Sequence, residues 1–420
     1  MRQRSFRAYV VGKAAGFRCG MVLPYREVAA SFADLSELHN IAVEEDSTQP
    51  WKSASGGIHW DRDRAVMAAI GEALERYAAS AAVFPVRKLR DLKQNARAIP
   101  HSEWSLFSDE QYSSAGFPWK RIDPEDAYFG EAYSLLTNER VWVPQELIGL
   151  GPRTGEALFP STSTGVAAHF DVATALLLAL QEVLERDALT VYWLNSLGGR
   201  EMVLSEKYLA PVRARRGKVW CFDMTQDWNP HPVVAVCGYL PQRNKRRISL
   251  GAACRPTYKE AIEKAYLEWV QGVVFAGYYD VYHPDLRLEK REEVTDFDRH
   301  AVYYTLHPHR WEKVPLLRKR RPFRPSRSSF CRSRTARECL PRLLASLQKA
   351  GIRVFYRDLT TPDVRDVGLT VVRVLSPELS LLHGDERVPF LGGRVRDVAW
   401  RYPDKVADVA FPNPNPHPLG

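Results

Sequence analysis

The chain has 420 residues, of which 45% are hydrophobic, 26% charged and 11% aromatic, with a formal net charge of +9. This length and composition indicate a globular protein with a large core. They exclude a collagen-like chain, a long disordered chain and a small disulfide-bonded scaffold. No run approaches the roughly 18 consecutive apolar residues of a membrane span, and the apolar stretch near the start is too short for a signal peptide. We therefore expect a cytoplasmic protein.

The positive charge is concentrated in one segment. Residues 310–337 contain eleven Lys or Arg and one acid, so the rest of the chain is close to neutral. The segment is rich in Pro and Ser, which is typical of a solvated loop or an insertion. The functional alternative is a docking strip for an acidic peptide or partner protein. No nucleic-acid-binding signature accompanies the strip, which disfavours a nucleic-acid partner.

Strand-like and helical segments alternate along the chain. Helical spacing and good helix formers predict helices at 62–80, 171–195 and 257–277. Runs of β-branched or aromatic residues predict strands at 141–143, 218–223, 232–240, 352–357 and 369–375. This mixture of elements predicts an α/β or α+β fold.

Two of the predicted helices have capping residues. Asp171 directly precedes the second helix as an N-cap. Thr257 precedes the third helix, and Glu260 follows three residues later in a capping-box pattern.

The first two helices carry a partial internal repeat. The sequence ExxER occurs late in both, each time after a loop of small residues, at 53–57 and at 161–165. The repeated residues are Glu72, Glu75 and Arg76 in the first helix and Glu182, Glu185 and Arg186 in the second. The third helix adds Glu268 and Gln271, again three residues apart. The repeat suggests related helices around a common centre.

The repeat is typical of a site for a metal ion and a phosphate group. Glutamates three residues apart share a helix face, and several carboxylates brought together repel unless a cation compensates them. Mg²⁺ takes oxygen ligands, and arginine is a bidentate partner for phosphate. The alternative is a solvated helix face with local ion pairs. Leu74, Val183 and Leu184 leave these helices little polar surface, which favours interior acids.

These residues resemble the YcaO family, specifically its azoline-forming peptide cyclodehydratases, of the stand-alone type found as the D protein of thiazole/oxazole-modified microcin synthases. The resemblance rests on residues 56–80, 163–193, 251–272 and 355–379 and on a tail with the PxPxP pattern. It implies a YcaO-like fold with mixed sheets flanked by helices. It also implies a single YcaO domain over 1–420, with 310–337 as a basic insertion and 411–420 as a proline-rich tail.

The resemblance assigns roles to the repeated residues. It makes Glu72, Glu75, Glu182 and Glu185 candidate Mg²⁺ ligands. It assigns ATP binding to Arg76, Arg186, Lys264, Glu268 and Gln271. Lys264 stands where the family often has an arginine, which keeps the charge and loses the bidentate fork.

Four positions depart from the family pattern. Ala68 replaces a usual serine, and Phe170, Thr174 and Leu178 replace Asn, Glu and Gln. One expected carboxylate ligand is therefore missing, and His169 and Asp171 are candidates to substitute for it. These departures keep a non-catalytic scaffold subunit as an alternative.

The family reaction forms a thiazoline or oxazoline from Cys, Ser or Thr in a ribosomally made peptide. The side chain attacks the preceding amide carbonyl, and ATP phosphorylates the resulting oxygen so that it can leave. In this branch the proline tail places the chain end at the active site, which assigns a positioning role to Pro412, Pro414, Pro416 and Pro418. A rigid extended tail loses little entropy on insertion. The Gly420 carboxylate and His417 are candidate general bases.

The resemblance also implies partners. They are the precursor peptide, an E1-like partner that binds its leader, and an FMN-dependent azoline dehydrogenase, with this chain as a homodimer in a larger complex. The chain begins almost directly with family sequence, which favours the stand-alone form without a fused peptide-recognition domain. A YcaO enzyme that forms a thioamide or an amidine remains a further alternative, which the proline tail disfavours.

Overall fold

The computed structural model describes residues 9–16, 20–28, 37–44, 55–92, 96–121, 125–242, 245–325, 335–406 and 410–420. The chain divides into two compact units. The first comprises Met1–Val28, Glu37–Val183 and Ala336–Leu379, and the second comprises Ala29–Ser36, Leu184–Thr335 and Ser380–Gly420. The division falls within one helix, α4 (Val172–Leu194). The expectation of a single domain over the whole chain stays a prediction.

The first unit contains two sheets. A three-stranded antiparallel sheet has the order β1-β2-β3, and a six-stranded sheet has the order β4-β5-β13-β14-β7, with β6 paired to β5. The strands are β1 (Tyr25–Glu27), β2 (His39–Val43), β3 (Gly56–His59), β4 (Val86–Lys88), β5 (Tyr128–Ser134), β6 (Arg140–Pro144), β7 (Val166–His169), β13 (Phe355–Asp358) and β14 (Thr370–Leu375).

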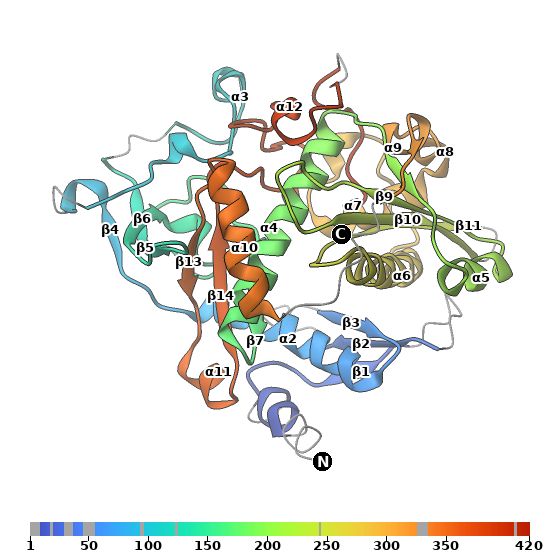
Figure 1. The fold of residues 1–420 in the computed structure, drawn as a ribbon, viewed down its shortest axis with the longest axis horizontal. Helices are drawn as coiled ribbons and strands as arrows, with labels where there is room; N and C mark the ends of the chain where they lie inside the picture. The colour runs from blue at the N-terminus through green and yellow to red at the C-terminus, as the bar shows by residue number, and fades with distance from the viewer. Residues whose placement is uncertain are drawn as a thin grey trace. The chain divides into compact units, whose positions relative to one another are not determined.

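Helix α2 covers strands β2 and β3 of the first unit (Figure 1). Its apolar face is made of buried residues, among them Ile70, Ala73 and Leu74. The helices of this unit are α2 (Arg62–Ala81), α3 (Asp109–Ser113), α10 (Ala336–Lys349) and α11 (Pro362–Asp366), with short 3-10 turns at Leu89–Asp91, His101–Glu103 and Gln145–Leu147.

The second unit is built on one five-stranded sheet. Its order is β11-β10-β9-β8-β12, antiparallel except for the β8–β12 pair. The strands are β8 (Arg200–Met202), β9 (Lys218–Asp223), β10 (Val233–Gln242), β11 (Lys245–Cys254) and β12 (Arg321–Pro322). Strands β10 and β11 are almost wholly buried at their centres, because helix α6 (Tyr258–Tyr282) packs along both of them (Figure 1).

The other helices of the second unit are short. They are α5 (Glu206–Ala214), α7 (Phe297–Leu306), α8 (Pro308–Trp311), α9 (Pro315–Arg318) and α12 (Val398–Arg401), with a 3-10 turn at Arg291–Glu293. Among the described residues, no helix has both the length and the apolar character needed to cross a bilayer.

The sequence prediction of a mixed α+β fold is confirmed. The three predicted helices correspond to α2, α4 and α6, and the five predicted strands correspond to β6, β9, β10, β13 and β14. Asp171 accepts a hydrogen bond from the amide of Thr174, so the predicted N-cap of α4 is present. Thr257 accepts from the amide of Glu260, whose carboxylate in turn accepts from the Thr257 hydroxyl.

The basic segment 310–337 is partly folded. Helix α9 and strand β12 lie within its first half, helix α8 ends there, and Trp311, Leu316 and Leu317 are buried. These apolar side chains anchor the start of the segment to the second unit, whereas residues 318–322 are exposed. Residues 326–334, which carry part of the arginine strip, lie outside the described residues.

Two strand–helix pairs use a glycine for close packing. A Cβ at Gly57 of β3 would clash with the backbone of Ala65 and Ala69 on α2, and a Cβ at Gly251 of β11 would clash with the backbone of Ala265 and Trp269 on α6. Only a residue without a side chain allows the strand to approach the helix so closely. The β3–α2 and β11–α6 pairs are therefore packed in the same way.

We predict that Gly57→Ala destabilises the protein by about 1–3 kcal/mol, because the new methyl group meets helix backbone that has no room to move. Gly71→Ala is the matched control, because nothing lies within 4 Å of a Cβ built there. That substitution, within α2, should stabilise by up to about 1 kcal/mol. Urea unfolding followed by circular dichroism measures both. Equal stabilities of the two variants would contradict the packing argument.

Candidate functional site

The carboxylates of the ExxER repeat are held by backbone amides. Glu72 accepts a hydrogen bond from the Gly56 amide at 2.9 Å, and Glu182 accepts one from the Gly165 amide at 3.3 Å. Each of these glycines precedes or begins the strand that leads into the helix carrying the glutamate. The first glutamate of each repeat thus reaches back to its own strand–helix connection.

The second glutamate of each repeat reaches the next strand–helix pair. Glu75 accepts from the Ala168 amide of β7 at 2.7 Å, and β7 leads into α4. Glu185 accepts from the Cys254 amide at the end of β11 at 3.3 Å, and β11 leads into α6. The two copies of the sequence repeat therefore make the same pattern of hydrogen bonds from backbone amide to glutamate.

Three of these carboxylates belong to the first unit, and two of them act on the third. Burial raises the pKa of Glu75 well above its usual value, and the negative charges of Glu182 and Glu72 raise it further. The Ala168 amide and Arg76 act in the opposite direction. Arg76 forms an ion pair with Glu72 at 2.8 Å. The effect of these charges on Glu75 is the kind of repulsion that a bound cation relieves.

A buried arginine interacts with one of these acids, Glu182, and the sequence analysis missed it. Arg373 is on β14, opposite Val166 of β7, and its side chain is 1% exposed. Burial lowers its pKa to about 10, and the charge of Glu182 opposes this shift. Within the described ranges, its Nε and Nη1 atoms have no hydrogen-bond partner. A charged residue inside the apolar run TVVRVL was the available signal.

Five other candidates belong to the second unit. Arg186 lies 3.5 Å from Glu185, measured from Nε to Oε1. On α6, Lys264 pairs with Glu268 at 2.9 Å. Gln271 lies three residues after Glu268 and seven after Lys264, on the same helix face, because residues three, four and seven apart share a face. Each unit therefore contains acids next to a cationic side chain.

At the start of α4, the structure shows what Thr174 does and how the two candidate replacement ligands, His169 and Asp171, are used. Thr174 donates its hydroxyl to the Asp171 carboxylate, which also forms an ion pair with Arg337. His169 accepts a hydrogen bond from the Asp171 amide, and burial lowers its pKa. Asp171 is therefore used as a helix cap. Neither Asp171 nor His169 is among the charges that act on Glu75.

The other departures lie on or near helix surfaces. Ala68 and Phe170 are exposed, and Leu178 is partly buried. Nothing in the structure explains the choice of these side chains. Ser53 and Ala54, which begin the first small-residue loop, lie outside the described residues.

The proline tail is fixed by hydrogen bonds within the second unit. Asn413 donates its backbone and side-chain N–H groups to carbonyl oxygens at the end of α4, and Trp193 of α4 donates to the Asn415 carbonyl at 2.7 Å. Tyr304 of α7 donates to the Pro416 carbonyl. Residues 410–420 contain no helix or strand, as predicted, and the tail is not a frayed end.

The two candidate general bases in the tail, His417 and Gly420, differ in their exposure to solvent. His417 has no exposed surface, and its Nε2 atom bonds to the His383 carbonyl. Gly420 is exposed and packs against Ala301 of α7. A general base must reach the proton it removes, and the burial of His417 does not favour that role. Both assignments stay predictions.

Comparison with known protein families gives one match. The model described as YcaO cyclodehydratase, ATP- and Mg²⁺-binding, matches residues 56–380. The chain belongs to the YcaO family. This result confirms the family expected from the sequence, together with ATP and Mg²⁺ as cofactors. A comparison with curated proteins found no significant match.

Several solved structures share this YcaO fold. A heterocyclase in complex with substrate and cofactor has a TM-score of 0.77 at 21% identity, over 99% of this chain and 57% of that one. YcaO from Methanopyrus kandleri bound with AMPPCP and Mg²⁺ has a TM-score of 0.63 at 18% identity, over 92% of this chain and 91% of that one. The E. coli microcin synthetase McbBCD complex with pro-MccB17 bound has a TM-score of 0.61 at 17% identity, over 84% and 88%. The chain spans little more than half of the heterocyclase chain.

The residues of the first unit fit the family's ligands. Glu72, Glu75 and Glu182 offer carboxylate oxygens, which are the ligand type that Mg²⁺ prefers, and the negative charges of Glu182 and Glu72 raise the pKa of Glu75. Two buried guanidinium nitrogens of Arg373 have no hydrogen-bond partner among the residues that the structure describes, and they suit a phosphate oxygen. The donor set therefore agrees with a nucleotide and its metal ion.

We predict that Glu75→Gln raises the melting temperature of the ligand-free protein, and that the gain grows with pH. A raised pKa means that the folded state binds the proton more tightly than the unfolded state, so ionisation of Glu75 costs stability as the pH rises above about 4.5. Glutamine removes this cost and keeps an oxygen for the Ala168 amide. Melting temperatures from about pH 5 to about pH 8 measure the effect.

Glu139→Gln is the control for this measurement, because Glu139 is an exposed acid of the same unit. Its melting temperature should follow the wild type at every pH. A Glu75→Gln variant that is less stable than wild type across the whole range would contradict the charge argument.

Proposed function

We propose that this YcaO protein catalyses the ATP-dependent cyclodehydration of Cys, Ser or Thr residues in a ribosomally made precursor peptide, which forms thiazoline or oxazoline rings. The observation that carries the proposal is that the charges of Glu182 and Glu72, on two repeated helices, act on the buried Glu75, and that Glu182 also interacts with the buried Arg373. The similar structures include a heterocyclase with its substrate and a synthetase with a bound precursor, which supports a peptide substrate.

We assign the metal site to the four glutamates of the repeat and the phosphate contacts to nearby cations. Glu72, Glu75, Glu182 and Glu185 would hold Mg²⁺. Phosphate groups would be bound by Arg76, Arg186, Lys264 and the newly identified Arg373, with Glu268 and Gln271 as further nucleotide-binding residues. The backbone amides that already hold the glutamates would keep their carboxylates oriented in the loaded enzyme.

The chain's own residues supply charge and orientation for the reaction. Bound ATP supplies the phosphoryl group that turns the amide oxygen into a leaving group. Arg373 holds a positive charge at a fixed, buried place, where an electrostatic interaction is stronger than in water. Glu75 must lose its proton to become a ligand, because only the carboxylate form binds a cation well. The tail residues Pro412, Pro414, Pro416 and Pro418 would keep the chain end in one conformation.

We also propose that the chain works in a complex with an E1-like leader-binding partner and an FMN-dependent dehydrogenase. The resemblance of the fold to the McbBCD complex supports a multi-subunit assembly. The arginines at 318–325 are a candidate docking surface, because their guanidinium groups lie on short surface elements at the edge of the sheet of the second unit.

The reaction is tested by mass spectrometry. The chain is incubated with ATP, Mg²⁺, a leader-binding partner and a Cys-rich precursor encoded beside it. We expect the precursor to lose the mass of one water for each ring, with consumption of ATP. A gain of sulfur would instead identify a thioamide-forming enzyme. An unchanged precursor together with no ATP binding would identify a scaffold subunit.

The nucleotide site is tested by calorimetry with a non-hydrolysable ATP analogue. We predict that Glu182→Gln and Arg373→Lys each weaken Mg²⁺-dependent binding by about tenfold or more, because each removes a charge-assisted contact worth roughly 1.5–3 kcal/mol. The Arg373→Lys variant keeps the positive charge but loses the planar guanidinium group that can bind two oxygens at once.

Glu139→Gln again serves as the matched control and should bind like wild type. Circular dichroism verifies that each variant is folded before binding is measured. Equal affinities of Arg373→Lys and Glu139→Gln would remove Arg373 from the site. Binding that is unaffected in all variants would place the nucleotide elsewhere.

A further inference from the structure

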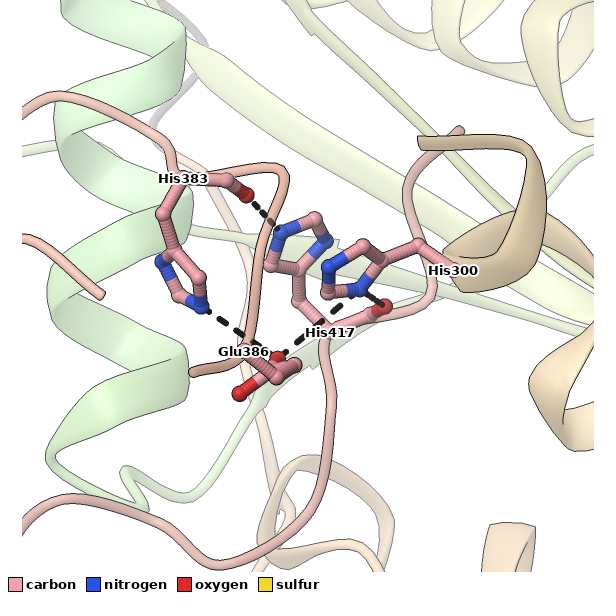
Figure 2. Close-up of side chains that lie close together, drawn as sticks. All are labelled: His300, His383, Glu386 and His417. Atoms are coloured by element: carbon pink, nitrogen blue, oxygen red, sulfur yellow. Dashed lines mark hydrogen bonds and ion pairs between the residues drawn. The ribbon is translucent and has the colours of Figure 1, made fainter. Parts of the chain in front are cut away.

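Three histidines and one glutamate form a buried cluster in the second unit, away from the repeated glutamates in the sequence. His300 is on α7, His383 and Glu386 follow β14 in the loop before α12, and His417 is in the proline tail. Their exposed fractions are 0%, 3%, 5% and 0%. One ligand atom from each side chain lies within 4.8 Å of the corresponding atoms of the others. Figure 2 shows these residues gathered from three separate stretches of chain.

The backbone fixes the proton on two of the rings. A nitrogen of His300, Nδ1, lies 2.8 Å from the His417 carbonyl oxygen, and Nε2 of His417 lies 2.7 Å from the His383 carbonyl oxygen (Figure 2). A carbonyl oxygen only accepts hydrogen bonds, so both nitrogens carry the proton and donate it. The lone pair of each neutral ring is therefore on the other nitrogen, Nε2 of His300 and Nδ1 of His417.

These lone pairs have no partner within the described part of the chain. Nε2 of His300, Nδ1 of His417 and Nδ1 of His383 are buried and make no hydrogen bond there. Burial lowers the pKa of His300 to about 4 and that of His417 well below its usual value, so both rings are neutral at pH 7. Neutral imidazole is the form that binds a metal, and a ligating histidine commonly donates its other N–H to a carbonyl oxygen.

A carboxylate completes the set. Burial raises the pKa of Glu386, but His383, Arg291 and His300 outweigh burial and hold it below its usual value. An oxygen of Glu386, Oε1, lies 3.2 Å from Nε2 of His383 and 3.8 Å from Nδ1 of His300. The other oxygen, Oε2, forms an ion pair with Arg291 at 2.6 Å. The carboxylate is thus ionised, oriented from outside the cluster and directed towards the histidines.

We propose that His300, His383, Glu386 and His417 form a structural site for a divalent transition-metal ion, with zinc as the metal to test first. Imidazole nitrogens and a carboxylate oxygen suit zinc, whereas Mg²⁺ prefers oxygen ligands alone. Four protein ligands make a closed site, which is typical of structural rather than catalytic zinc. The site shares no residue with the proposed nucleotide site and does not rest on the proposed function.

Metal binding requires a small rearrangement. Ligand atoms about 2 Å from zinc lie roughly 3.3 Å apart in a tetrahedral site. The ligand atoms of the cluster are separated by up to 4.8 Å. The rings of His300 and His417 are also stacked, with centroids 3.7 Å apart and an angle of 6° between planes. Two parallel rings cannot direct in-plane lone pairs at one point, so one ring must tilt.

The metal would tie the tail to the body of the second unit. His417 is the tail's ligand, His300 comes from α7, and the other two ligands come from the segment after β14. Loss of the metal should therefore loosen the tail and lower the stability of this unit, because the metal binds the folded chain and not the unfolded one.

The experiment uses the full chain purified without a polyhistidine tag. Elemental analysis should find one zinc ion per chain. Removal of zinc with a strong chelator should lower the melting temperature, and added zinc should restore it. Cobalt added to the stripped protein should bind saturably at one equivalent, with the visible absorption of a tetrahedral site.

His383→Gln and Glu386→Gln should each reduce the zinc content to near zero. His231→Gln is the matched control, because His231 is another buried histidine of the same unit outside the cluster, and it should retain the zinc. If a cluster variant does not fold, the chelator and cobalt measurements on the wild type decide. Wild-type protein without zinc and without saturable cobalt binding, or equal zinc in the cluster variants and the control, would overturn the proposal.

Discussion

Hydrogen bonds from backbone amides to the repeated glutamates are the interaction on which this structure depends. Each of the four carboxylates accepts from an amide of a strand or loop, the first of each repeat from its own strand–helix connection and the second from the next one. A peptide amide is a neutral donor, so it orients a carboxylate without cancelling its charge. The arrangement therefore fixes several acids in place, and the negative charges of Glu182 and Glu72 raise the pKa of Glu75, an effect that a bound cation would offset.

The prolines and the asparagines of the C-terminal tail have different structural roles. Proline has a fixed φ and no N–H, so Pro412, Pro414, Pro416 and Pro418 limit the conformations of the segment but donate nothing. The intervening asparagines supply donors: Asn413 bonds to the end of α4, and Asn415 donates to Asn413. The proline carbonyls still accept, as Pro416 does from Tyr304. The tail is thus ordered without belonging to any sheet or helix.

The local features of this fold could be predicted from sequence, whereas the long-range ones could not. Helices α2, α4 and α6 follow from a 3.6-residue period, and Asp171 and Thr257 act as caps because a cap involves only neighbours in sequence. The proximity of Glu75 to Glu182 was suggested by the repeat. Arg373 was missed because its role depends on the pairing of β14 with β7, which no local pattern specifies. The cluster around His417 was missed for the same reason, because it joins three distant segments.

The raised pKa of Glu75 links cation binding to proton release. If the carboxyl group is protonated in part of the ligand-free molecules, an arriving cation must displace that proton, and the apparent affinity for the cation rises with pH until the group is fully ionised. The released proton is taken up by the buffer. The heat measured on binding therefore includes the buffer's enthalpy of protonation, and measurements in two buffers of different ionisation enthalpy would count the protons that leave.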